Sequence, residues 1–132
     1  MADEISFQGS ISVNATNFTE VISPGQVSID LPSGPDLASE GGTQATSNTM
    51  SSLQVGNLGS SQDGGVFFFR NLDSTNNIEI GEDLSGFKPW LLLKPGEYAM
   101  GRLSSRYPST ALKVKSSAGT PVLQYRIFAG DL

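Results

Sequence analysis

The chain alternates apolar and polar residues in short segments, and no segment of about ten residues or more has the spacing of an amphipathic helix. In residues 5–13, the apolar side chains at positions 5, 7, 11 and 13 fall on one face, and the other face carries serine or glutamine. Successive side chains of a β-strand point to opposite faces, so this alternation predicts a half-buried strand. Comparable segments, separated by turn sequences, occur at 27–31, 66–69, 78–81, 87–93, 97–103, 111–115 and 122–128. About eight such strands predict an all-β chain, folded as an antiparallel β-sandwich or as a jelly-roll-like barrel.

The length of 132 residues is typical of one domain. We therefore expect a single β-sandwich domain over residues 1–132, with a strand-rich N-terminal segment at 1–32. Residues 33–65 are rich in Gly, Ser, Thr and Asn. Long loops inside compact domains are uncommon unless they are functional, so this stretch is predicted to be a Gly/Ser-rich contact loop. The alternative is a surface loop with one short strand near residues 50–55.

Six side chains are candidates for contacts with other proteins. The run 66–69 places Phe67 and Phe69 on one face of a strand and Phe68 on the other, so both faces need cover, from the core and from a loop or another subunit. Tryptophan, tyrosine and arginine dominate the energetics of protein interfaces. The interface candidates are Phe68, Lys88, Trp90, Arg102, Arg106 and Tyr107. Trp90 lies in the apolar run 87–93, where a place in the core is the alternative.

Composition removes many kinds of chemistry. The chain has no histidine and no cysteine, which excludes the commonest general base, the thiol nucleophile and zinc sites with nitrogen or sulfur ligands. Glu79, Glu82 and Asp83 lie close together in the sequence, but charged groups of a solvated turn explain them better than a calcium site or a glycosidase pair does. We therefore expect no enzyme activity, no catalytic residues, no metal and no cofactor.

Charge is distributed unevenly along the chain. Residues 1–69 contain seven acidic residues and no basic one, and from Arg70 onward eight basic residues accompany six acidic ones. The basic half of one chain can therefore attract the acidic half of a neighbour, although solubility alone is the simpler explanation. A net charge of −5 argues against nucleic acid as the main partner. No stretch approaches the roughly 18 apolar residues of a membrane span, and Met1 to Glu4 do not resemble a signal peptide, so we expect synthesis in the cytoplasm and no membrane partner.

The second half of the chain resembles small virion structural proteins of tailed bacteriophages, of the capsid decoration or cement type. The similarity covers about residues 50–130, and the similar segments are Gly65–Asp73, Asn77–Gly81, Leu92–Ala99 and Leu123–Phe128. The resemblance implies an antiparallel sandwich without catalysis that assembles through subunit contacts. The implied partners are the chain itself, as a trimer, and the major capsid protein on the exterior of the virion capsid. The alternatives are a neck, tail-tube or tail-fibre adaptor component, and a carbohydrate-binding module.

Overall fold

The computed structural model describes residues 5–29, 38–56, 58, 64–104 and 112–129 of the chain. Contacts between residues divide the chain into two compact units, Met1–Ser33 and Gly34–Leu132. The sequence predicted one domain over 1–132, with 1–32 as a segment of it. The difference arises because the described strands of the first unit pair with one another and not with strands of the second.

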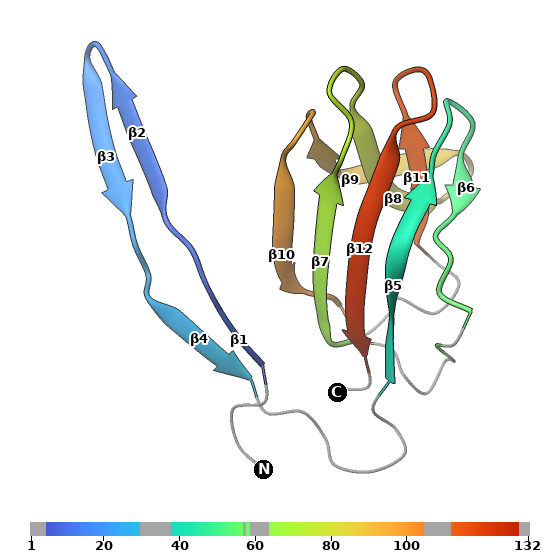
Figure 1. The fold of residues 1–132 in the computed structure, drawn as a ribbon, viewed down its shortest axis with the longest axis horizontal. Coiled ribbons are helices and arrows are strands. Elements are labelled where there is room, and N and C mark those ends of the chain that lie inside the picture. Colours follow the sequence, from blue (N-terminus) through green and yellow to red (C-terminus); the bar gives the residue numbers. More distant parts are fainter. Residues whose placement is uncertain (1–4, 30–37, 57, 59–63, 105–111, 130–132) are drawn as a thin grey trace. The chain divides into compact units, whose positions relative to one another are not determined.

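The first unit is a two-stranded ribbon of four short strands (Figure 1). These are β1 (Ile5–Gln8), β2 (Ile11–Ala15), β3 (Phe18–Ile22) and β4 (Gln26–Ile29). β2 pairs antiparallel with β3 around a turn at residues 16–17, and β1 pairs antiparallel with β4. We refer to residues 5–29 as the N-terminal ribbon.

The second unit is a β-sandwich of two antiparallel four-stranded sheets (Figure 1). One sheet has the order β10-β7-β12-β5 and the other the order β6-β11-β8-β9. The strands are β5 (Ala38–Ala45), β6 (Ser51–Ser52), β7 (Val66–Asn71), β8 (Ile78–Asp83), β9 (Phe87–Leu93), β10 (Tyr98–Arg102), β11 (Lys113–Ser116) and β12 (Val122–Ala129). The predicted all-β class and antiparallel sandwich are confirmed, and the sheets do not close into a barrel.

The core lies between the two sheets. Alternate side chains of each central strand point inward, and Phe69, Ile80 and Ile127 are fully buried there. The apolar residues that the Gly/Ser-rich stretch contains at positions 53, 55 and 58 belong to the same cluster. Burial of these side chains supplies the main stabilisation of the sandwich.

Residues 33–65, expected to form a contact loop, contain an eight-residue strand in their described part. β5 pairs with the full length of β12, from Ala45 opposite Val122 to Ala38 opposite Ala129. A Cβ atom at Gly41 would lie 2.5 Å from the carbonyl oxygen of Tyr125, so the close approach of the two strands requires glycine. Because β5 is built from small and polar residues, it lacks the apolar alternation that reveals a strand. The short strand expected near 50–55 is present as β6.

Side chains fix the turn from β7 to β8. Asn71 is fully buried, and its Nδ2 donates hydrogen bonds to the carbonyl oxygens of Asn76 (2.8 Å) and Leu93 (3.1 Å). Its Oδ1 accepts a hydrogen bond from the N–H of Asp73 (2.9 Å). The Asp73 carboxylate accepts hydrogen bonds from the N–H groups of Asn76 and Thr75, which lower the pKa of Asp73. This turn connects β7 of one sheet with β8 of the other.

Candidate contact surface

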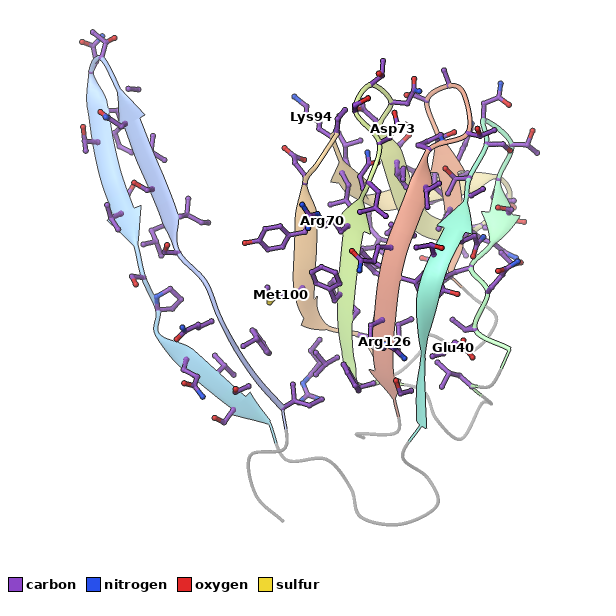
Figure 2. The ribbon with its side chains drawn as sticks, viewed as in Figure 1. Glu40, Arg70, Asp73, Lys94, Met100 and Arg126 are labelled. Carbon is purple, nitrogen blue, oxygen red and sulfur yellow. The ribbon has the colours of Figure 1, made fainter. Side chains whose placement is uncertain are left out.

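One face of the sheet β10-β7-β12-β5 points away from the core. On β7, Phe67 and Phe69 face the core, so Phe68 and Arg70 point outward. The strand register places Phe68 beside Met100 of β10 and Arg126 of β12, and places Arg70 beside Tyr98. Figure 2 shows Arg70, Met100 and Arg126 on three adjacent strands of this sheet. We call the five side chains Phe68, Arg70, Tyr98, Met100 and Arg126 the aromatic–arginine face.

Much of this surface is apolar and accessible. Tyr98 is 59% exposed and Met100 is 38% exposed, while Phe68 is half-buried. The rings of Phe68 and Tyr98 stack with their centroids 6.2 Å apart and their planes at 30°. Such diagonal pairs on adjacent strands stabilise a sheet and hold both rings in place. The aromatic–arginine face is therefore an ordered apolar surface in the isolated chain.

The charges on this side of the sheet have one sign. The outward positions of β10, β7 and β12 are 98, 100 and 102, then 66, 68 and 70, then 124, 126 and 128. The structure describes all nine, and they include three arginines and no carboxylate. A cationic, apolar surface of this kind favours a partner that presents apolar side chains together with carboxylates.

A second feature lies at the edge of the sandwich, where β9 of one sheet faces β7 and β10 of the other. A hollow of about 280 Å³ is lined by Phe67, Trp90, Arg102, Leu103 and Ser104. Trp90 is 41% exposed and meets the Phe67 ring edge-on at 6.3 Å. The register of β8 and β9 shifts between Ile80 and Gly81, so that β9 has one extra residue there, Trp90. Bulges of this kind redirect a side chain, which here places the indole over Phe67.

The structure separates the interface candidates that the sequence suggested. Phe68 belongs to the aromatic–arginine face, whereas Trp90 lines the hollow. Arg102 lines the hollow too, and it is the last outward position of β10. Lys88 is exposed on β9, opposite Glu82 in the strand register. Arg106 and Tyr107 lie outside the described residues.

Sequence reasoning missed four members of the aromatic–arginine face, Arg70, Tyr98, Met100 and Arg126. Each alternates correctly within its own strand, so the signal for outward orientation was present in the sequence. The sequence did not show that these side chains are neighbours. Their proximity depends on β7 lying between β10 and β12 in the sheet, and both of those strands come much later in the chain than β7.

Among the described residues, no group of three His, Cys, Asp or Glu side chains could hold a metal ion. Burial raises the pKa of the Tyr125 hydroxyl, and the Glu40 carboxylate raises it further. That hydroxyl donates a hydrogen bond to the carbonyl oxygen of Gln54, which is a structural role. No helix in the described part of the chain is long and apolar enough to cross a membrane.

Comparisons with known proteins give little further information. No family model matches the chain, and no curated protein matches it significantly. A solved structure from the Bacillus endospore appendages, described as a family of disulfide-linked pili, has 11% sequence identity with this chain. The similarity covers 76% of this chain and 98% of the other, with a TM-score of 0.35. A likeness this weak supports no conclusion about function.

Proposed function

We propose that the chain is a non-enzymatic structural subunit, and specifically a decoration protein that binds the outside of an assembled bacteriophage capsid. The carrying observation is that both sheets expose large apolar side chains. The aromatic–arginine face exposes Tyr98 and Met100, and edge strand β9 exposes Trp90 (41%) and Leu92 (50%). Apolar patches with a polar rim are typical of protein interaction sites.

A decoration protein needs two kinds of contact, one with its own copies and one with the shell. The sandwich offers two separate surfaces for them, the outer face of one sheet and the edge strand of the other. A protein that binds the assembled shell but not its free subunits stabilises the shell by its binding free energy, as a ligand stabilises a folded protein. No proton or electron transfer is needed for this role.

The test is retention of the purified chain on capsids of the encoding phage that lack it, measured by co-sedimentation. We expect the wild type to sediment with the shells. Leu92→Ser should be retained at least about tenfold less, because it removes an exposed apolar side chain from edge strand β9, the surface proposed to contact the shell. Leu92 lies outside the core, so the variant should still fold. No retention of the wild type would refute the proposal. Thermal unfolding of Leu92→Ser serves as the folding control.

Copy number distinguishes the related alternatives. Quantitative mass spectrometry of virions should give hundreds of copies for a shell protein, whereas roughly six or twelve would place the chain in the neck or tail. The hollow beside Trp90 is the feature that would favour a carbohydrate-binding module. Binding on a glycan array that disappears in Trp90→Ala would support that alternative instead.

A further inference from the structure

In each of the two strand pairs of the N-terminal ribbon, most apolar side chains share one side. In its β2–β3 part, the pairs Ile11–Ile22 and Ala15–Phe18 lie on the same side as Val13–Glu20, because cross-strand partners share a face and alternate pairs point the same way. The pairs between them, Ser12–Val21 and Asn14–Thr19, lie on the opposite side. In the β1–β4 part, Ile5, Phe7 and Val27 share one side, and serine and glutamine occupy the other.

Several of these apolar side chains are exposed, whereas Ile5, Phe7 and Val13 are half-buried. Ile11 is 63% exposed, Phe18 54% and Ile22 50%. A lone two-stranded ribbon is at best marginally stable in water, and it becomes stable when its apolar face packs against another surface. The N-terminal ribbon therefore needs a cover that its own strands do not supply.

The aromatic–arginine face has matching chemistry. The ribbon's apolar face carries one charged side chain, the carboxylate of Glu20. Residues 1–33 contain four acidic residues in all and no basic one, whereas the outward positions of β10, β7 and β12 contain three arginines and no acidic residue. Apolar contact between the two surfaces would bring charges of opposite sign together.

We infer that the ribbon of one copy packs its apolar face on the aromatic–arginine face of a second copy of the chain. Every chain has one ribbon and one such face, so one repeated contact between copies covers both. Reciprocal exchange closes a dimer, and exchange in one direction around a ring closes a trimer or larger ring. The inference rests on the proposed function, since it names the N-terminal ribbon of a second copy as the partner of the aromatic–arginine face.

Matched single variants locate the contact. Ile22 and Val21 are adjacent, both β-branched and similarly exposed, but they lie on opposite sides of the ribbon. Ile22→Ser should lower the association constant of the full chain about tenfold or more, and Val21→Ser should leave it nearly unchanged. On the sandwich, Met100→Ser should weaken association, and Leu92→Ser on the other sheet should not. Light scattering across a concentration series gives the association constants.

Charge exchange tests whether the contact is between copies. In Glu20→Lys, the N-terminal ribbon carries a lysine that would be repelled by the arginines of the aromatic–arginine face. In the double variant Arg70→Glu with Arg126→Glu, the face is acidic and would be repelled by Glu20 of the ribbon. Each protein alone should stay monomeric while circular dichroism reports a folded sandwich. An equimolar mixture should assemble into mixed oligomers, because every ribbon–face contact between unlike chains again joins opposite charges.

Three results would overturn the inference. They are a wild type that is monomeric at every concentration, charge variants that assemble alone, and a mixture that stays monomeric. The last result, with ribbon amides protected from hydrogen exchange, would mean that the ribbon packs on its own chain. Failure of the proposed function is distinguishable: a chain that self-associates as described but is not retained on capsids refutes only the capsid role.

Discussion

Phe68 and Phe69 are neighbours in the sequence whose replacement should have different consequences. Phe69 is fully buried in the core, and the centroid of its ring lies 4.9 Å from that of Phe67. Truncation of such a side chain to alanine costs about 3–5 kcal/mol, from lost burial and the cavity that remains. Phe68 points outward, and Phe68→Ala mainly loses the stacked pair with Tyr98, worth about 0.5–1.5 kcal/mol.

Thermal unfolding of the two variants measures this difference. For a unit of the size of residues 34–132, 1 kcal/mol corresponds to a change in Tm of about 4–8 °C. Phe69→Ala should therefore lower Tm by roughly 12 °C or more, and Phe68→Ala by roughly 2–12 °C. The comparison should be made at a concentration at which both proteins are monomeric, since association itself raises Tm.

The same pair of variants tests the role of the aromatic–arginine face. Phe68→Ala should weaken self-association of a chain that remains folded. Equal losses of stability in the two variants would show that Phe68 belongs to the core and would refute the assignment of its face. Unchanged association in folded Phe68→Ala would show that the face is not used for assembly.

Two further predictions concern the turn from β7 to β8. Asn71→Ala should destabilise the sandwich by about 2–4 kcal/mol in chemical denaturation, because it leaves the buried carbonyl of Leu93 and the N–H of Asp73 without their hydrogen-bond partner; a loss below about 0.5 kcal/mol would contradict this. The pKa of Asp73 is lowered in the folded state, so its stabilising contribution is present above the pKa of the unfolded chain, about 3.9, and is lost as the pH falls through the folded pKa. Asp73→Asn should therefore lose less stability than the wild type between neutral pH and acid, and parallel curves of Tm against pH would refute the role of this carboxylate.

Local pattern was sufficient to predict most of the strands. The apolar alternation at 78–81 and 122–128 corresponds to β8 and β12, and the Lys94-Pro95-Gly96 turn separates β9 from β10 as expected. β5 was missed because a strand of glycine and small polar residues has no alternation to detect. Its conformation is set by pairing with β12, which is about 80 residues further along the chain.

The sequence by itself determined the all-β class, the two-sided character of the Phe67–Phe69 strand and the acidic nature of the first 69 residues. Only the tertiary structure decided which strands are adjacent, and therefore that Tyr98, Met100, Arg70 and Arg126 surround Phe68 on one surface. The physical reason is that alternation fixes the direction of a side chain relative to its own strand. Its neighbours on the next strand depend on long-range pairing, which is set by how the whole core packs.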